Sequence, residues 1–235
     1  MLVARNLVKN YGSKRVVDGV SIQVKRGEIV GLLGPNGAGK TTIFYSIMGI
    51  IRPDRGKIFL DDAEITDFSL DKKARMGIGY LAQEPSIFRG LTTYENLLAV
   101  AEFLEKKPQE IEEVIEKMQI HHCRNVKASH LSGGEKRRTE ISRILLTNPS
   151  FLLLDEPFVG IDPIAVSELK KIVLSFKEQN LGILITDHNV WETLKIIDRA
   201  YIIHKGKILI EGDRDKLLAS PEAREIYLGK EFAIM

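Results

Sequence analysis

The residues best suited to chemistry form one glycine-rich stretch that fits the phosphate-loop pattern G-x-x-x-x-G-K-[ST]. It reads Gly34-Pro35-Asn36-Gly37-Ala38-Gly39-Lys40-Thr41-Thr42. Glycines let the backbone curl around a polyphosphate, and the amides of the following helix then point at the anion. In this pattern Lys40 reaches the β- and γ-phosphates and Thr41 ligates Mg²⁺. An apolar strand-length run precedes the loop and a helical pattern follows it, so we predict a nucleotide site rather than a chance glycine turn.

Three further polar residues stand at the ends of two apolar, strand-length runs. Asp155 and Glu156 close the run that begins at residue 151, and His188 follows the run 181–186. Parallel α/β sheets bind their ligands at such strand ends. We expect Asp155 to help hold Mg²⁺, Glu156 to orient or deprotonate the attacking water, and His188 to hydrogen-bond the γ-phosphate. The alternatives are two solvated carboxylates and an ordinary surface or core histidine.

The stretch Leu131-Ser132-Gly133-Gly134-Glu135 offers a second site for an anion. Ser-x-x-Glu is also a capping box, so a plain helix start is the alternative. Two glycines in a first helical turn cost about 1 kcal/mol each relative to alanine. Open amides at a helix N-terminus, together with a serine hydroxyl, suit a phosphate group. The glycines therefore favour a phosphate contact over a cap alone.

The elements that must position these residues alternate between strand and helix patterns. Alternating and buried apolar runs predict an edge strand over 2–9 and further strands at 16–24, 28–33, 57–60, 78–82, 151–155, 181–186 and, as a hairpin, 199–212. Helical patterns occupy 43–48, 92–104, 108–120, the segment that begins at Asp162-Pro163, and the last twenty residues. This order predicts an α/β fold into which a helical block is inserted.

Composition limits the class of protein. The 235 residues carry a net charge of +2, which gives no strong electrostatic case for nucleic acid or acidic membranes. The single cysteine, Cys123, excludes an internal disulfide and suits a reducing compartment. The start of the chain lacks a signal-peptide pattern, and no apolar run approaches the roughly 18 residues that span a bilayer. We therefore expect any membrane part of the system on other chains.

Together these motifs resemble the ATP-binding cassette (ABC) family of ATPases, and the stretch 131–135 is the most diagnostic part of the resemblance. The resemblance implies an α/β phosphate-loop NTPase with a RecA-like core, an antiparallel β subdomain and an inserted helical subdomain. The core would span 1–83 and 147–235, and the helical subdomain 84–146, within one nucleotide-binding domain. The motifs follow the family's order along the chain: the phosphate loop, Gln83, 131–135, 151–156, Gly160-Ile161-Asp162 and His188.

The resemblance also implies the ligands and how they are held. ATP and Mg²⁺ would bind, and ATP would be hydrolysed. Tyr11 would stack on the adenine, since a π-face can make that contact with any base. Gln83 would contact Mg²⁺ and water and assist catalysis, while Thr41 and, through water, Asp155 would complete the metal site.

Pairing of two copies follows from the same resemblance. Two chains would associate head to tail with two-fold symmetry. Ser132, Gly133 and Gly134 of one chain would then cover the γ-phosphate that the phosphate loop of the other chain holds. ATP would be part of a homodimer interface that closes on binding and reopens after hydrolysis.

Several stretches are similar to the ATP-binding subunits of lipopolysaccharide exporters, notably Phe158 after Asp155-Glu156-Pro157, the run Asp187-His188-Asn189-Val190, and Tyr227-Leu228-Gly229. The similarity implies two transmembrane permease partners and a place on the cytoplasmic face of the inner membrane. Ala82, Trp191 and the tail Phe232-Ala233-Ile234-Met235 depart from the family pattern. Branched-chain amino acid importers are the alternative, and a soluble ABC ATPase or an inactive regulator fits less well.

Two remaining features have competing explanations. Phe88, in a segment bounded by Pro85 and Gly90, is either locally packed or, as the resemblance implies, a contact for the membrane partner. The cluster His121-His122-Cys123, with His130 nearby, lacks the spaced pairs typical of zinc sites, so we do not expect a structural metal there. Trp191 fits packing better than function.

Overall fold

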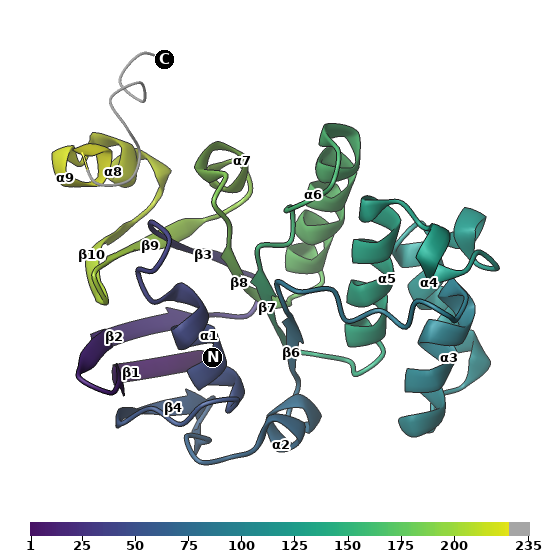
Figure 1. Ribbon diagram of the computed structural model, residues 1–235, viewed down its shortest axis with the longest axis horizontal. Helices are drawn as coiled ribbons and strands as arrows, with labels where there is room; N and C mark the ends of the chain where they lie inside the picture. The colour runs from purple at the N-terminus through teal and green to yellow at the C-terminus, as the bar shows by residue number, and fades with distance from the viewer. Residues whose placement is uncertain (226–235) are drawn as a thin grey trace.

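Residues 1–225 are described in the computed structural model of this chain, and residues 226–235 lie outside that description. The larger sheet has the strand order β10-β9-β3-β8-β7-β6. Strands β9, β3, β8, β7 and β6 pair in parallel, whereas β10 pairs antiparallel with β9. The parallel strands end at one edge of the sheet, which is where their loops can build a site (Figure 1). Their bounds are β3 Ile29–Leu33, β6 Ile78–Leu81, β7 Phe151–Asp155, β8 Gly182–Thr186, β9 Arg199–His204 and β10 Lys207–Gly212.

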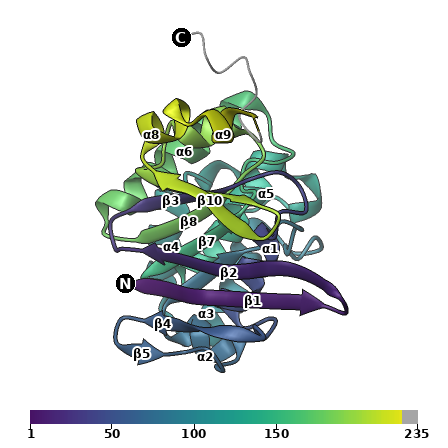
Figure 2. The same ribbon diagram turned by 90° about the vertical axis from the view of Figure 1, so that its left-hand side faces the viewer.

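The smaller sheet is antiparallel and has the order β2-β1-β4-β5, with β1 Leu2–Tyr11, β2 Lys14–Val24, β4 Arg55–Leu60 and β5 Ala63–Glu64. Figure 2 shows β1 between β2 and β4, so the prediction of an edge strand over 2–9 is wrong. Charged residues such as Arg5 suggested an edge. Antiparallel sheets can solvate one face, however, and Arg5 is exposed on a strand that is paired on both sides.

Strand β7 shows how the apolar runs are used. Leu152 and Leu154 belong to a hydrophobic cluster that includes residues of α5 Gly133–Leu145 and α6 Pro163–Glu178. Phe151 and Leu153 point the other way, into a cluster with α1 Lys40–Met48 and the smaller sheet. Both faces of the strand are therefore covered, as the continuous apolar run predicts.

The block between β6 and β7 is helical, as predicted. Helices α3 Thr93–Phe103, α4 Pro108–Lys117 and α5 contact one another, with the short 3₁₀ turns η1 His121–Cys123 and η2 Ala128–His130 between α4 and α5. Figure 1 places them on the side of the molecule away from β1 and β2. Their apolar residues share one cluster with β7 and α6, so the division into a core and a helical subdomain stays a prediction.

The C-terminal part begins with the predicted hairpin, β9 and β10, which turns at Lys205 and Gly206 with positive φ at both residues. The predicted terminal helix is described only in its first part, whereas Tyr227-Leu228-Gly229 and Phe232-Ala233-Ile234-Met235 lie outside the described residues. No helix within 1–225 combines the length and the apolar character that crossing a bilayer requires. The remaining helices are α2 Leu70–Arg75, α7 Val190–Leu194, α8 Arg214–Ala219 and α9 Pro221–Ala223.

Candidate active site

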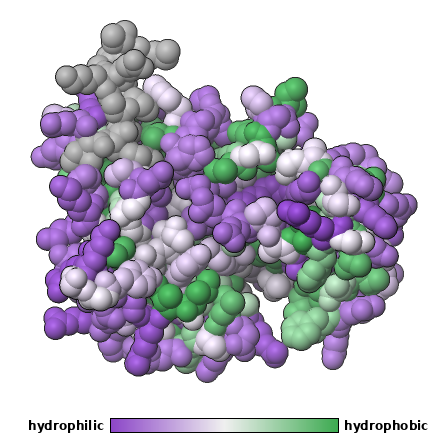
Figure 3. Space-filling model, in the orientation of Figure 1, coloured by the Kyte–Doolittle hydropathy of each residue, from purple (hydrophilic) through white to green (hydrophobic). Residues whose placement is uncertain are grey.

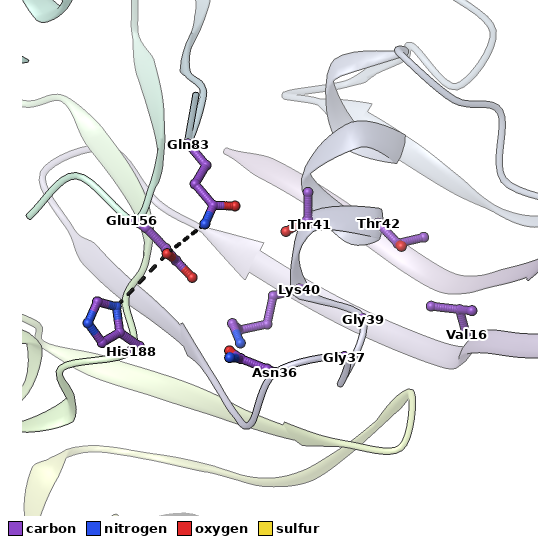
Figure 4. Close-up of a pocket in the computed structure, with 10 residues that line it drawn as sticks. All are labelled: Val16, Asn36, Gly37, Gly39, Lys40, Thr41, Thr42, Gln83, Glu156 and His188. Atoms are coloured by element: carbon purple, nitrogen blue, oxygen red, sulfur yellow. Dashed lines mark hydrogen bonds and ion pairs between the residues drawn. The ribbon is translucent and has the colours of Figure 1, made fainter. Parts of the chain in front are cut away.

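One cavity of about 520 Å³ gathers most of the residues that the sequence singles out. It opens at the carboxyl edge of the larger sheet, between the start of α1 and the ends of β7 and β8 (Figure 4). Residues from five separate parts of the chain meet there, so the fold brings together the motifs that the sequence singles out. The lining residues are Val16, Asn36, Gly37, Gly39, Lys40, Thr41, Thr42, Gln83, Glu156 and His188.

Helix α1 begins without a side-chain cap from its N-cap residue. Its cap residue, Gly39, has φ 112° and offers no side chain, and its first turn contains no acidic residue. A Cβ at Gly39 would also lie 2.7 Å from the carbonyl oxygen of Val16, so only glycine fits this position. The positive end of the helix thus faces the cavity with no acidic residue in its own first turn, which suits a phosphate group.

Lys40 is 93% buried beside this helix start, with 7% of its surface exposed. Its Nζ donates hydrogen bonds to the carbonyl oxygens of Gly34 at 2.7 Å and Pro35 at 3.1 Å. Burial lowers the pKa of Lys40, while the carboxylates of Glu156, Asp155 and Asp187 raise it. The Lys40 ammonium is therefore held by these two carbonyl oxygens, in a position from which it can reach a polyphosphate. Gly34, Pro35 and Ala38 shape the loop without lining the cavity.

Asp155 lies beneath the cavity at the end of β7, where only 1% of its surface is exposed. Its Oδ1 accepts a hydrogen bond from the Thr186 hydroxyl at 2.6 Å, and its Oδ2 has no hydrogen-bond partner within residues 1–225. Burial raises the pKa of this carboxyl group. A buried carboxylate oxygen without a donor suits a cation, and the Thr41 hydroxyl and Gln83 amide oxygen are the ligand types that Mg²⁺ accepts. The donor set therefore fits the expected magnesium ion.

Glu156 carries a half-buried carboxylate that lines the cavity, at the turn that follows β7. Its φ of 49° is unusual for a side chain other than glycine, and its amide donates to the Thr186 carbonyl oxygen at 3.0 Å. Its Oε2 accepts from Gln83 Nε2 at 2.9 Å and lies 3.9 Å from Nδ1 of His188 (Figure 4). The three proposed catalytic side chains thus meet at one carboxylate oxygen.

Arg137 on α5 is a residue of this site that sequence reasoning missed. It is 6% exposed, and Glu140 on the next turn pairs with it at 3.2 Å. Glu140 also accepts a hydrogen bond from the amide of Ser86 at 2.5 Å. Sequence could not reveal this role, because the acceptors of Arg137 are main-chain oxygens that only the fold brings together. They belong to Ala82, Asp155, Glu156 and Pro157.

The stretch Ser132-Gly133-Gly134 does not line the cavity, although it stands at a helix start as predicted. Ser132 and Glu135 form a complete capping box on α5. A Cβ on Gly133 would lie 2.7 Å from the carbonyl oxygen of Gly160, and one on Gly134 would lie 2.6 Å from Cβ of Ala165. Close packing therefore explains both glycines without an anion, and the sequence argument from their cost is not decisive.

Comparison with known proteins decides the family. A family profile described as ABC transporter matches residues 17–159, which is more than half of the chain. The chain belongs to the ABC transporter family. The match includes the phosphate loop, Gln83, the start of α5 and Glu156, so it covers all the cavity-lining residues except Val16 and His188.

Relatives of this ABC chain match it along its whole length. The lipopolysaccharide export system ATP-binding protein LptB of Acidithiobacillus ferridurans is 50% identical over 100% of this chain and 99% of its own. A probable ABC transporter ATP-binding protein of Azorhizobium caulinodans is 52% identical over 99% of this chain and 84% of its own. A crystal structure of an ABC transporter's ATP-binding cassette in its ADP conformation is 30% identical, with a TM-score of 0.89, and covers 98% of this chain and 99% of its own.

Membership gives the chain its activity class: it is an ABC ATPase that binds ATP and hydrolyses it. The α/β fold predicted from the motifs is confirmed by the same comparisons. The comparisons do not assign roles to single residues. The roles of Lys40, Glu156 and His188 therefore stay predictions, which the geometry of the cavity supports.

Tyr11 and Phe88 are surface residues in this ABC ATPase. Tyr11, at the end of β1, is 49% exposed and does not line the cavity, whereas Val16, which the sequence analysis did not select, does. Phe88 is 48% exposed. The Arg143 guanidinium lies 4.5 Å from the centre of its ring and donates to the carbonyl oxygen of Ser86 at 2.6 Å. Phe88 is thus presented outward by a contact from α5.

The histidine and cysteine cluster gains a member from the fold. His122, Cys123 and Glu135 place one possible ligand atom each within 4.8 Å of one another. His122 Nε2 already hydrogen-bonds Glu135 Oε1 at 2.9 Å, and Glu135 Oε2 accepts from the amide of Ser132 at 2.7 Å. Burial raises the pKa of the Cys123 thiol, which opposes the thiolate that a metal needs. The group is explained as a support for the cap of α5. Trp191, on α7, is half-buried.

Proposed function

We propose that this chain is the ATP-hydrolysing subunit of a lipopolysaccharide exporter, acting as a homodimer with two transmembrane permease subunits on the cytoplasmic face of the inner membrane. The observation that carries the ATPase part is the cavity in which Lys40, Glu156 and His188 meet around one helix N-terminus. The cargo rests on full-length identity of about half to proteins named for lipopolysaccharide export. One of these, from Escherichia coli K12, is 48% identical over 99% of both chains.

The cavity supports a division of labour in hydrolysis. The amides at the start of α1, together with Lys40, bind the β- and γ-phosphates. Glu156 accepts a proton from the attacking water or orients it. His188 lies beside that carboxylate and donates a hydrogen bond to the γ-phosphate. The Gln83 amide already donates a hydrogen bond to the Glu156 carboxylate. The position of Gln83 therefore depends on whether that carboxylate also binds another group, such as the attacking water.

The metal ligands in this proposal are Thr41, Gln83 and, through water, Asp155. Mg²⁺ would neutralise charge on the phosphate oxygens. Asp155 contributes from beneath, where its partnerless Oδ2 is the deepest oxygen of the three side chains. The Thr186 hydroxyl keeps the other oxygen of Asp155 in place.

A second copy completes the site in this proposal. Ser132, Gly133 and Gly134 lie outside the cavity of their own chain, so they can serve as a lid only for another one. Two chains paired head to tail would each offer this stretch to the partner's γ-phosphate. Tyr11, which is exposed at the end of β1, would stack on the adenine.

The membrane partner would dock at Phe88. Arg143 and the amide of Phe88, which donates to Asn96 Oδ1 at 2.9 Å, keep the ring at the surface. Figure 3 shows apolar side chains at several places on this face, over α3 among them, between larger polar areas. An apolar contact point beside the Gln83 segment would transmit partner movement to the catalytic carboxylate. No nucleic acid partner is part of this proposal.

Other functions fit less well. A branched-chain amino acid importer would use the same ATP site, but the relatives named here favour lipopolysaccharide export. A soluble ABC ATPase would need a partner outside the membrane, and none of the motifs described above indicates such a partner. An inactive regulator conflicts with the gathered set of Lys40, Glu156 and His188.

Two measurements test the proposal. Glu156→Gln should lower ATP turnover of the full chain at least about 100-fold while ATP binding is retained, because only proton transfer is removed. Glu102→Gln, an exposed glutamate on α3, is the matched control and should keep wild-type turnover. Purification from native membranes followed by mass spectrometry should recover lipopolysaccharide-export permeases. Recovery of amino acid permeases, or wild-type turnover of Glu156→Gln, would contradict the proposal.

A further inference from the structure

Lys170, in the middle of α6, is a buried cation to which neither the motifs nor the cavity assigns a role. It is 7% exposed, and a lysine is rarely buried to this extent without a partner for its charge. Helix α6 begins directly after the loop that follows Glu156, with Asp162 as its N-cap. A buried charge on this helix is therefore close to the catalytic segment along the chain.

The partners of Lys170 come from the two segments that carry the proposed catalytic pair. Its Nζ forms an ion pair with Glu192 on α7, four residues after His188. The same Nζ lies 5.5 Å from the centre of the Phe158 ring, two residues after Glu156. Burial lowers the pKa of Lys170 to about 8, while the carboxylate of Asp187 opposes that change. The Lys170 side chain thus contacts both the segment that follows Glu156 and the segment that follows His188.

Short-range hydrogen bonds at the start of helix α7 connect Glu192 to the turn that contains His188. The amide of Glu192 donates to Oδ1 of Asn189 at 3.2 Å, and the amide of Asn189 donates to Oδ1 of Asp187 at 2.7 Å. The His188 side chain itself is 60% exposed, with Nδ1 at 3.7 Å from Asp187 Oδ1. The backbone of this turn, rather than the imidazole's own contacts, therefore sets where His188 lies.

We propose that Lys170 is a positioning residue for ATP hydrolysis. By joining Glu192 to the segment of Phe158, it holds the turn of His188 at a fixed distance from Glu156. The inference rests on the proposed roles of Glu156 and His188, because it concerns their relative position. The inference also includes helix α6, which begins directly after the loop 158–162. A movement of that loop would therefore be transmitted to His188 through the ion pair between Lys170 and Glu192.

The test is the steady-state ATPase activity of the full chain carrying Lys170→Met. Methionine keeps the length and apolar stem of lysine and removes its charge. We expect kcat to fall about tenfold, because a misplacement of about 1 Å can lower a rate up to about 100-fold. KM for ATP should change less than about twofold, since Lys170 does not line the cavity. Lys170→Arg, which keeps the charge, should restore at least half of the wild-type kcat.

Two neighbouring lysines provide matched controls. Lys195 pairs with the same Glu192 at 2.7 Å, but its side chain is 56% exposed. Lys171 follows Lys170 on α6 and is exposed. Lys195→Met and Lys171→Met should each keep kcat within about twofold of the wild type, because exposed ion pairs contribute little.

Glu192→Gln provides a second route to the same pair, which is useful if Lys170→Met does not fold. This variant should also lower kcat, and combining it with Lys170→Met should lower kcat no further than the stronger single change. Wild-type kcat in Lys170→Met, or an Arg variant as slow as the Met variant, would overturn the inference. These results leave the proposed function intact, whereas wild-type turnover of Glu156→Gln would overturn both.

Discussion

Two helices of this ABC ATPase begin with glycine-rich turns, and their N-termini are satisfied in opposite ways. Helix α1 starts after Gly39 with no side-chain cap and no acidic residue in its first turn. Helix α5 starts after Ser132 with a complete capping box, and Glu135 stands in its first turn. The first N-terminus lines the cavity, and the second does not line the cavity of its own chain.

This difference indicates that the start of α1 can bind an anion by itself, whereas the start of α5 can only assist in binding one. At α1 the backbone amides and the Lys40 ammonium can bind a negatively charged ligand. At α5 the Glu135 carboxylate accepts a hydrogen bond from the amide of Ser132, and the Ser132 hydroxyl accepts one from the amide of Glu135, so these two bonds do not involve the amides of Gly133 and Gly134. We therefore expect changes at α1 to remove ATP binding, and changes at α5 to affect turnover only.

The largest expected effect is at Lys40. Lys40→Met removes the ammonium that reaches the phosphates, and we expect ATP affinity to fall at least about 100-fold, since charge-assisted hydrogen bonds are the strongest kind. Isothermal titration calorimetry with MgATP measures this directly. Lys73→Met is the control, because Lys73 is also buried and donates to the carbonyl oxygen of Ile47 at 2.8 Å, near the other end of α1. Equal loss in both variants would refute a specific role for Lys40.

A smaller effect is expected at the start of α5. In Gly134→Ala the new methyl group would meet Cβ of Ala165 at 2.6 Å and push α5 away from α6. We expect turnover to fall about tenfold while ATP affinity of the single chain stays within about twofold. Gly90→Ala is the control, because a Cβ there meets no atom within 4 Å. Loss of ATP affinity in Gly134→Ala would break the distinction between the two helix starts.

A weaker effect is expected at the proposed docking residue. Phe88→Ala should reduce co-purification with the membrane subunits about fivefold, because it removes one apolar anchor. Phe103→Ala is the matched control, since Phe103 is 76% exposed at the end of α3. ATP affinity should be unchanged in both variants. Unaltered recovery of the complex with Phe88→Ala would exclude Phe88 from docking.

The smallest effect on function is expected at the far end of α1, where a change of pH should alter stability alone. Burial lowers the pKa of Lys73 to about 8, so above pH 8 the folded chain binds fewer protons here than the unfolded chain. Stability relative to Lys73→Met should therefore rise between pH 8 and pH 10, by about 2 kcal/mol. Chemical denaturation of both chains at each pH measures the difference. A difference that stays constant with pH would mean that Lys73 does not titrate in this range.

The parts of this picture that sequence predicts are those carried by local patterns. The phosphate loop, the buried strand β7 and the two strand-end motifs at Glu156 and His188 each depend on neighbouring residues, and they meet as predicted. The edge strand over 2–9 was wrong because pairing partners are distant in the chain.

Contacts that depend on close approach of distant segments could not be predicted. Arg137 acts through main-chain carbonyl oxygens, and Lys170 through a partner on another helix, so neither leaves a spacing pattern. The glycines at the start of α5 illustrate the converse. Their pattern was recognised, but packing against Gly160 and Ala165 supplies a reason that sequence alone cannot show.

Crosslinking between two differently tagged chains tests the central claim, that the start of α5 closes over the ATP held by a partner. One chain carries Asn36→Cys at the exposed edge of the phosphate loop, and the other carries Ser132→Cys. Both also carry Cys123→Ser, which removes the native thiol, and Glu156→Gln, which prevents turnover.

The account predicts that a short thiol-reactive crosslinker joins the two chains when MgATP is present and fails to do so without nucleotide. The product would contain both tags and have about twice the 26.5 kDa mass of one chain. A mixture in which Glu102→Cys replaces Ser132→Cys should give no such product. Equal crosslinking with and without ATP, or none in either condition, would contradict the account.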